Sequence, residues 1–264
     1  MLDTKPLSII IVNYRSKLNL ARCLASIYNS EKEKTPELIV VNNDANEKLS
    51  DLKKLYPEIV VINHSRNVGY GSANNLGSKI ASGKYLFLLN PDTEIVSVDL
   101  NLLIDEFQNN GELGIIGIKI INEAGFPQPW SVGKEISWKD LIANNLGLSR
   151  SRSFWDKPVK REVDWVSGTA MVIKKELFFD LGGFDENFFM YFEDMDLCRR
   201  ARKAGKKVAY RPTHIVRHSG GASYAKNSKE QKNDYFRSQD YYFHKHFGKF
   251  HSMLLRTLRR TFGK

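Results

Sequence analysis

The chain has 264 residues, of which 42% are hydrophobic and 27% charged, and it carries a formal net charge of +10. This composition is typical of a globular protein with a sizeable core, and no stretch reaches the roughly 18 apolar residues that a membrane-spanning helix requires. The positive charge predicts an anionic partner, which can be nucleic acid, anionic lipid or a phosphate-bearing small molecule.

The N-terminal residues and the cysteines indicate where the protein works. The first twenty residues lack the charged start, apolar run and small-residue cleavage site of a signal peptide. Cys23 and Cys198 stand far apart on predicted helices, so we expect two reduced, buried thiols rather than a disulfide. Both features predict a cytosolic protein.

Strand and helix patterns alternate through the first half of the chain. Apolar, β-branched runs predict strands at residues 7–12, 38–41, 59–62 and 85–89. Helical periodicity predicts helices at about residues 18–28, 49–56, 70–81 and 99–109. Strands separated by helices predict an α/β fold with a parallel sheet that is covered on both faces.

Polar residues follow three of these predicted strands. Asn13 comes after the first strand, Asn-Asn-Asp at 42–44 after the second, and Asn-Pro-Asp at 90–92 after the fourth. Open α/β sheets bind ligands outside the carboxyl ends of their strands. The pattern therefore predicts a binding site at this edge of the sheet.

The second half of the chain is less regular. Strands are predicted at residues 114–121 and 165–173, and helices at 175–181 and 192–204. Residues 122–159 are predicted to be loop-rich, with one short helix near 139–146. The helix at 192–204 has acids in its first turns and bases in its last, which complement its dipole. We predict one domain in two parts, 1–110 and 111–221, with a basic helical extension at 222–264.

Asp92 is a candidate metal ligand. It follows a predicted buried strand, with Asn90 before it and Glu94 close by. Mg²⁺ and Mn²⁺ prefer hard oxygen ligands and often take one or two carboxylates together with substrate phosphates. Asn-Pro-Asp is also common in plain turns, and taken alone this motif favours the turn.

Glu193, Asp194 and Asp196 follow a run of large apolar residues at 189–192. Helix capping would explain acids at the start of a helix. Carboxylates against an apolar wall can instead serve as a catalytic base, because their surroundings change their proton affinity. The residues leave both interpretations open.

Two weaker motifs accompany these acids. His218 ends a predicted strand before a Ser-Gly-Gly turn, where a histidine can hold a metal or a phosphate, although a lone histidine is more often structural. Arg-Asn-Val-Gly-Tyr-Gly at 66–71 opens a helix, and glycines there can let a pyrophosphate approach the backbone. The spacing matches neither the dinucleotide fingerprint nor a P-loop.

Taken in order, these segments resemble the family 2 glycosyltransferases with a GT-A fold, and most closely the rhamnosyltransferase-like branch that builds bacterial cell-surface polysaccharides. Five motifs between residues 7 and 221 carry the resemblance: Ile-Ile-Val-Asn-Tyr at 10–14, Val-Val-Asn-Asn at 40–43, Arg-Asn-Val-Gly-Tyr-Gly at 66–71, Leu-Asn-Pro-Asp at 89–92, and Trp-Val-Ser-Gly at 165–168 leading to Gly-Gly-Phe-Asp at 182–185 and Glu-Asp-Met-Asp-Leu-Cys at 193–198. It implies a Rossmann-like, mostly parallel central sheet with helices on both faces.

The resemblance also implies a role for each matched residue. Asp194 would be the general base that deprotonates the acceptor hydroxyl, with Glu193 beside it. Asp92 would hold Mg²⁺ or Mn²⁺ against the donor diphosphate, with His218 as a further ligand. The donor would be contacted by Asn13, Tyr14, Asn42, Asp44, Asn67, Gly69, Asn74 and Asn90, and the acceptor or sugar by Trp165, Gly168 and Tyr191. The implied reaction is an in-line displacement that inverts the anomeric configuration.

Two positions depart from the pattern of the family. Asn42 stands where the family usually has Asp, and an amide donates as well as accepts, which alters the expected contact with a uracil or thymine base; Asp44 is the expected substitute. Asn90 replaces the first acid of the Asp-x-Asp motif, which leaves fewer charges to hold the metal.

The C-terminal residues form a basic amphipathic pattern. Apolar and basic residues alternate there at helical spacing: Met253, Leu254, Leu255, Leu258 and Phe262 with Arg256, Arg259, Arg260 and Lys264. Such a helix suits an anionic membrane surface. It equally suits a helix that packs its apolar face on the body of the protein.

These patterns predict a transferase in the cytoplasm, peripheral to the inner face of the membrane. Its expected donor is a dTDP- or UDP-sugar, and dTDP-L-rhamnose is the first choice among them. Its expected acceptor is a saccharide or a lipid-linked saccharide. One alternative is a metal-dependent nucleotidyltransferase, but such enzymes usually carry a basic glycine-rich loop after the first strand, where this chain has Asn-Tyr-Arg-Ser at 13–16. The other is a non-catalytic module for RNA or another anionic polymer. It leaves the acids around Glu193 unexplained, so we expect no nucleic-acid partner.

Overall fold

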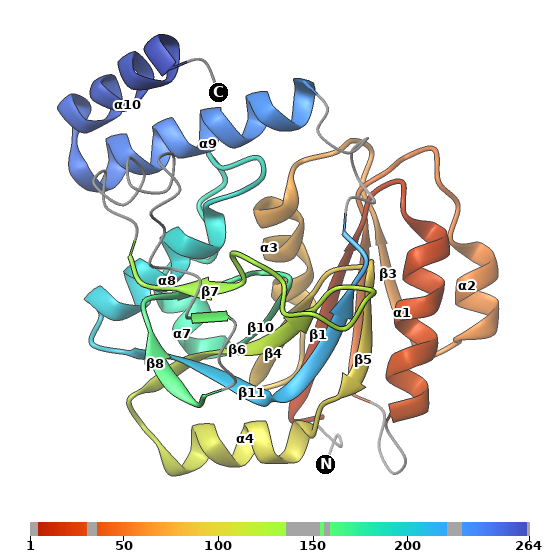
Figure 1. Ribbon diagram of the computed structural model, residues 1–264. Helices are drawn as coiled ribbons and strands as arrows, with labels where there is room; N and C mark the ends of the chain where they lie inside the picture. The colour runs from red at the N-terminus through yellow and green to blue at the C-terminus, as the bar shows by residue number, and fades with distance from the viewer. Residues whose placement is uncertain (1–4, 31–35, 136–153, 156–158, 221–228, 263–264) are drawn as a thin grey trace.

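The structure is a computed structural model that describes residues 5–30, 36–135, 154–155, 159–220 and 229–262 (Figure 1). A mixed sheet runs through its centre in the order β3-β2-β1-β4-β10-β6-β11-β5, and β8 pairs with β11. Its strands are β1 (Leu7–Asn13), β2 (Glu37–Asn42), β3 (Val60–Asn63), β4 (Tyr85–Leu89), β5 (Thr93–Ser97), β6 (Leu113–Ile121), β8 (Arg161–Val163), β10 (Ala170–Lys174) and β11 (Lys207–His218). A separate small sheet pairs β7 (Val132–Gly133) with β9 (Trp165–Val166).

The four strands predicted in the first half are parallel, as the sequence predicts. Beyond them the sheet is mixed, because β10 lies antiparallel between β4 and β6. The predicted strand at 165–173 is divided: β9 and β10 are separated by a turn at 167–169. β5 was not predicted; it follows Asp92 directly and pairs with β11.

Helices cover both faces of the sheet (Figure 1). They are α1 (Lys17–Ser30), α2 (Ser50–Leu55), α3 (Tyr70–Ile80), α4 (Leu100–Asn109), α7 (Lys175–Asp180), α8 (Glu193–Lys203), α9 (Lys229–Phe247) and α10 (Lys249–Phe262). The helix predicted at 139–146 lies outside the described residues. Among the described helices, none combines the length and the apolar character that crossing a bilayer requires.

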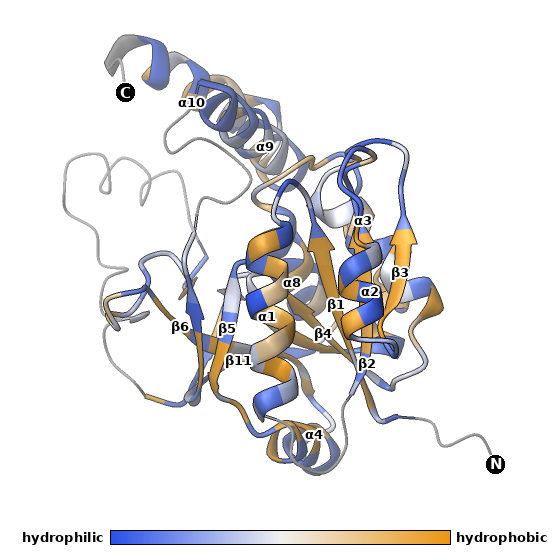
Figure 2. Cartoon of the chain, turned by 90° about the vertical axis from the view of Figure 1, so that its right-hand side faces the viewer, coloured by the Kyte–Doolittle hydropathy of each residue, from blue (hydrophilic) through white to orange (hydrophobic). Residues whose placement is uncertain are grey.

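Strand β1 shows why both faces need cover. All seven of its residues are buried, and alternate side chains enter different cores: Ile9 and Ile11 pack with α1, α2 and α4, whereas Ile10 and Val12 pack with α3, α7 and α8. Figure 2 shows these strands as a hydrophobic layer between helices of mixed hydropathy. The enclosed sheet fixes the positions of the strand ends that carry the polar residues.

Candidate functional site

Three asparagines end the neighbouring strands β1, β2 and β3 in register. The amide nitrogen of Asn13 donates to Asn42 Oδ1 over 3.1 Å, and that of Asn42 donates to Asn63 Oδ1 over 3.0 Å. Asn42 is 3% exposed and also donates to the carbonyl of Glu47. Both ends of the Asn42 amide thus bond within the protein, so this residue holds the strand ends together.

Glu47 joins this row, although no sequence motif pointed to it. Its carboxylate accepts from the amide of Asn13 over 2.7 Å and from the backbone N–H groups of Ser16 and Lys17 at the start of α1. A carboxylate at a helix N-terminus is stabilised by the helix dipole. No local pattern links Glu47 to α1, because the contact spans about thirty residues of chain.

Tyr14 and Asp44 lie at the outer edge of the same region. The guanidinium of Arg15 lies 5.1 Å from the centre of the Tyr14 ring, and its Nε lies 4.0 Å from a carboxylate oxygen of Asp44. The other oxygen of Asp44 accepts from the N–H of Asn46. This cluster leaves an aromatic ring and a carboxylate beside the buried asparagines.

The predicted Asn67–Gly69 segment is held by Asn43. Asn43 donates to Asn67 Oδ1 over 2.7 Å and accepts from the N–H of Val68. Gly69 has a φ of +88°, and a Cβ at this position would lie 2.4 Å from the carbonyl oxygen of Phe189. Only glycine fits here, and it brings the start of α3 against the segment that precedes α8.

Asn74 lies one turn into α3 and is fully buried. Its amide nitrogen donates to the carbonyl of Tyr70, four residues earlier. Its Oδ1 has no hydrogen-bond partner among the described residues. A buried acceptor without a partner is uncommon in native proteins and is a candidate ligand contact.

The two predicted metal ligands, Asp92 and His218, lie side by side. Asp92 Oδ1 is 3.1 Å from His218 Nε2, and both side chains are at most 10% exposed. They meet because β5 pairs with β11, which places Thr93 opposite His218. The other ring nitrogen of His218 lies 2.8 Å from Gln128 Oε1, a contact that no sequence motif predicted. Asn90 is tied nearby, since its N–H donates to the carbonyl of Thr169.

A carboxylate oxygen beside an imidazole nitrogen is a donor pair that Mn²⁺ accepts, provided that substrate oxygens complete the coordination. Within the described residues, no group of three or more His, Cys, Asp and Glu side chains could hold a metal. The pair therefore fits a metal that is shared with a diphosphate rather than one enclosed by protein.

Asp194 and Glu193 open α8. One oxygen of Asp194 accepts from the N–H of Gly168 over 2.9 Å, and the other accepts from the N–H of Met195. Burial raises the pKa of Asp194, and these N–H groups oppose the rise. Burial also raises the pKa of Glu193 well above its ordinary value, and the charge of Asp194 adds to the effect. Glu193 Oε2 has no hydrogen-bond partner among the described residues.

Tyr70 lies at the start of α3 and contacts the Gly168 peptide, to which Asp194 also bonds. Its phenol donates to the carbonyl of Gly168 over 2.6 Å. Burial raises the pKa of Tyr70, and the carboxylates of Glu193, Asp194 and Asp92 each raise it further. Because Gly168 bonds to Asp194 and Tyr70 while the next residue, Thr169, bonds to Asn90, the start of α8 and the segment of Asp92 meet at the same turn.

Trp165 and Tyr191, both predicted for the acceptor side, lie in different surroundings. Trp165 is 5% exposed and donates from its indole to the carbonyl of Lys134, so it belongs to the small sheet. Tyr191 is half-buried, and its hydroxyl accepts from the amide of Gln231 on α9. Tyr191 therefore contacts α9, whereas Trp165 is part of the hydrophobic core.

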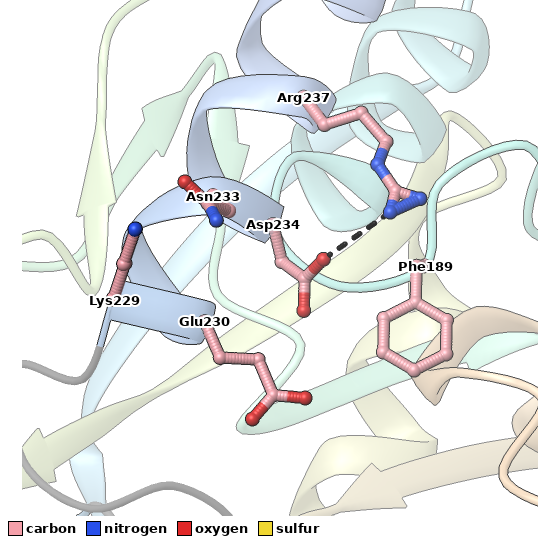
Figure 3. Close-up of a pocket in the computed structure, with 6 residues that line it drawn as sticks. All are labelled: Phe189, Lys229, Glu230, Asn233, Asp234 and Arg237. Atoms are coloured by element: carbon pink, nitrogen blue, oxygen red, sulfur yellow. Dashed lines mark ion pairs between the residues drawn. The ribbon is translucent and has the colours of Figure 1, made fainter.

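A cavity of about 660 Å³ lies between Phe189 and the first half of α9 (Figure 3). It is lined by Phe189, Lys229, Glu230, Asn233, Asp234 and Arg237. The carbonyl of Phe189 accepts from the N–H of Tyr70, so the cavity adjoins the region of the carboxylates. Most of its lining comes from α9, whose sequence predicted only a basic extension.

The sequence matches the family model described as "Glycosyl transferase family 2" over residues 8–176, and that described as "Glycosyltransferase like family 2" over residues 152–237. The low-salt glycan biosynthesis hexosyltransferase Agl10 of Haloferax volcanii is 30% identical over 77% of this chain and 63% of its own length. The N-acetylglucosaminyl-diphospho-decaprenol L-rhamnosyltransferase of Mycobacterium tuberculosis is 26% identical over 81% of this chain and 76% of its own. Rhamnosyltransferase WbbL of Escherichia coli is 28% identical over 60% and 65%.

Two solved structures share the fold. The structure of GalNAc-T7 with UDP, GalNAc and Mn²⁺ superposes with a TM-score of 0.66 at 19% identity, covering 92% of this chain and 50% of that one. That of Staphylococcus aureus TarS 1–349 with UDP gives 0.62 at 17%, covering 89% and 63%. This chain thus spans only part of several proteins that it matches. Its fold is GT-A, and it belongs to glycosyltransferase family 2, in the branch that includes the rhamnosyltransferases.

Proposed function

We propose that this protein transfers a sugar from a nucleoside diphosphate to a hydroxyl of a saccharide or lipid-linked acceptor, with inversion at the anomeric carbon. The observation that carries the proposal is the turn at Gly168–Thr169: the N–H of Gly168 donates to Asp194, and the carbonyl of Thr169 accepts from the N–H of Asn90, two residues before Asp92. A transfer of this kind needs a base at the acceptor and positive charge at the departing diphosphate. Asp194 would act as the base, and Asp92 would hold the divalent ion that supplies the positive charge.

Asp194 is the proposed base. The N–H groups of Gly168 and Met195 orient its carboxylate, and burial raises its pKa, which makes it a better proton acceptor than an exposed aspartate. The acceptor oxygen forms the bond to the anomeric carbon as the bond from that carbon to the phosphate oxygen breaks. The hydroxyl proton passes to Asp194, and the nucleoside diphosphate leaves.

Asp92 and His218 are the proposed holders of Mg²⁺ or Mn²⁺ at the diphosphate. A bound divalent ion would offset the negative charge that develops on the departing diphosphate. The two side chains supply one oxygen and one nitrogen, and His218 is oriented by Gln128 from its other ring nitrogen. The Mn²⁺ named with GalNAc-T7 supports this proposal.

The proposed donor is a dTDP- or UDP-sugar, with dTDP-L-rhamnose tested first. Rhamnosyltransferases among the relatives support the sugar, and the UDP complexes of two structures with this fold support a pyrimidine nucleotide. Tyr14 and Asp44 are the proposed contacts at the base, supported by Asn13, Asn42 and Glu47 below them. Asn67, Gly69, Asn74 and Asn90 are proposed to line the rest of the donor pocket.

A donor screen tests this function. Thermal unfolding is measured with Mn²⁺ and dTDP, UDP or GDP, and then with their common sugars. We expect dTDP or UDP to raise the melting temperature and GDP to have little effect. Stabilisation by none of these nucleotides would argue strongly against a nucleotide-sugar transferase.

A further inference from the structure

Two consecutive non-glycine residues adopt left-handed backbone conformations directly before the acidic pair. Tyr191 has a φ of +70° and Phe192 a φ of +67°. Residues with large side chains rarely adopt this conformation, and it persists only where the surroundings fix it. Because Phe192 is the residue before α8, the direction of this turn determines where Glu193 and Asp194 point.

Helix α9 contacts this turn with polar and aromatic groups. The hydroxyl of Ser238, which is 3% exposed, donates to the carbonyl of Met190 over 2.7 Å. The ring of Tyr235 packs against Tyr191 and Phe192, with centroid separations of 5.7 and 5.3 Å. These contacts fall on the strained residues and on the peptide before them.

The same helix also bonds to residues before and after the turn. Tyr241 donates to Asp185, which precedes the turn, over 2.9 Å. Lys245 and His246 each reach Asp196, in the first turn of α8, over 2.7 Å. Burial alone would raise the pKa of Asp196, but these partners together with Arg200 hold it below its ordinary value. The ends of the segment between Asp185 and Asp196 are therefore anchored to one helix.

Simple packing of a C-terminal helix on the domain would bury apolar side chains without regard to the backbone of the turn. Here the buried hydroxyl of Ser238 donates to one carbonyl, that of Met190, next to the strained residues. Burying a hydroxyl costs free energy unless it forms a hydrogen bond. Tyr242 and Phe243 pack the helix on the core, and the Tyr242 ring also lies against Phe192, with a centroid separation of 5.5 Å.

We propose that α9 is a positioning element for the catalytic acids: Ser238 and Tyr235 hold the left-handed turn at Tyr191–Phe192 that directs Asp194 to the N–H of Gly168. The inference rests on the proposed role of Asp194 as the base. Without these contacts the turn relaxes to negative φ, the start of α8 shifts, and the carboxylate loses its fixed direction. Misplacement of this kind lowers turnover more than it weakens donor binding.

The test uses the full chain with Ser238→Ala, and Ser252→Ala as the matched control. Ser252 is a similarly buried serine, 4% exposed, on α10. We expect Ser238→Ala to lower kcat by about tenfold or more, with the KM for the donor nearly unchanged. Amide hydrogen exchange at residues 190–195 should become faster in this variant alone. Ser252→Ala should change neither quantity.

A second pair covers the case in which Ser238→Ala does not fold. Tyr235→Leu removes the ring that packs on the turn at a position that is 37% exposed, so the fold should tolerate it. Phe250→Leu is its control, because that ring is 74% exposed on α10 and packs beside His251. Faster exchange at residues 190–195 in Tyr235→Leu alone supports the positioning role, and equal exchange in both variants overturns it.

The two proposals fail in different ways. Unchanged kcat and exchange in Ser238→Ala, alongside an inactive Asp194→Asn variant, would overturn the positioning role and leave the base in place. If Asp194→Asn keeps normal turnover, the assignment of the base is wrong, and the hydrogen exchange at residues 190–195 still decides whether α9 holds the turn.

Discussion

The backbone N–H of Gly168 donates to a carboxylate oxygen of Asp194 over 2.9 Å. The carbonyl of the same glycine accepts from the phenol of Tyr70 over 2.6 Å. Gly168 thus bonds to α8 through its nitrogen and to α3 through its oxygen. It can do so because a turn at residues 167–169 separates β9 from β10, so the peptide groups of Gly168 do not pair within a sheet. This link sets the acids of α8 against the start of α3.

Asp194→Asn should abolish sugar transfer while donor binding stays nearly intact, because the amide cannot take the acceptor proton. Asp180→Asn, at the exposed end of α7, is the control and should retain activity. Since burial raises the pKa of Asp194, kcat/KM of the parent enzyme should fall as the pH drops through a value above 3.8. Steady-state kinetics between pH 4 and 8 with isothermal titration of the donor measure both effects.

Glu193→Gln should raise the melting temperature at pH 7. Burial and the charge of Asp194 raise the folded-state pKa of Glu193, so the folded protein binds more protons than the unfolded chain above about pH 4.3. Stability therefore falls as the pH rises from about 4.3 toward the folded-state pKa, because the unfolded chain ionises Glu193 while the folded protein keeps it protonated, and a neutral amide removes that cost. The gain should vanish near pH 4, and a gain that is constant from pH 4 to 8 would contradict this reasoning.

Asp92→Asn and His218→Ala should each weaken the binding of Mn²⁺, so that about tenfold more metal is needed for the half-maximal rate. His64→Ala is the control for the histidine, because the His64 ring is half-buried and bonds locally to the backbone of Arg66. Gln128→Leu should have a smaller effect in the same direction, since Gln128 orients the His218 ring. An Asp92→Asn variant with an unchanged manganese titration would remove Asp92 from the metal site.

Gly69→Ala should destabilise the protein by about 1–3 kcal/mol and impair donor binding. The new Cβ would lie 2.4 Å from the carbonyl oxygen of Phe189, and the φ of +88° is unfavourable for alanine. Gly111→Ala is the control, because a Cβ at that position would meet no atom within 4 Å. Urea unfolding of the two variants measures the difference, and equal losses would contradict the close approach of α3 to Phe189.

The parallel half of the sheet was predictable from sequence because its strands are continuous apolar runs with clear helical intervals. The motifs at Asp92 and Asp194 were recognised, but their proximity depends on Gly168 and on the pairing of β5 with β11, which no local pattern encodes. The contacts of Glu47 with Asn13 and of Gln128 with His218 were not predictable for the same reason, since each spans a long stretch of chain. The turn at Tyr191–Phe192 carries no glycine that would have signalled its left-handed backbone.

The C-terminal helix allows a test of the proposed membrane location. One face of α10 packs within the protein: Leu255 is 7% exposed, and Arg259 forms an ion pair with Asp240 on α9. Its outer face still shows Phe250 and Met253, which are 74% and 65% exposed among basic residues. We propose that this face lies on the anionic inner surface of the cell membrane, where apolar insertion and positive charge act together.

The double variant Phe250→Ser/Met253→Ser in the full chain should lose most of its sedimentation with vesicles that contain anionic lipid, while its fold and activity on a soluble acceptor persist. Neutral vesicles should bind the parent protein weakly, and added salt should release it from anionic ones. Leu102→Ser is the control, because Leu102 is 55% exposed on α4, a helix of another part of the fold. Equal sedimentation of the parent and the double variant would show that this face does not bind lipid, and that α10 serves only to pack against α9.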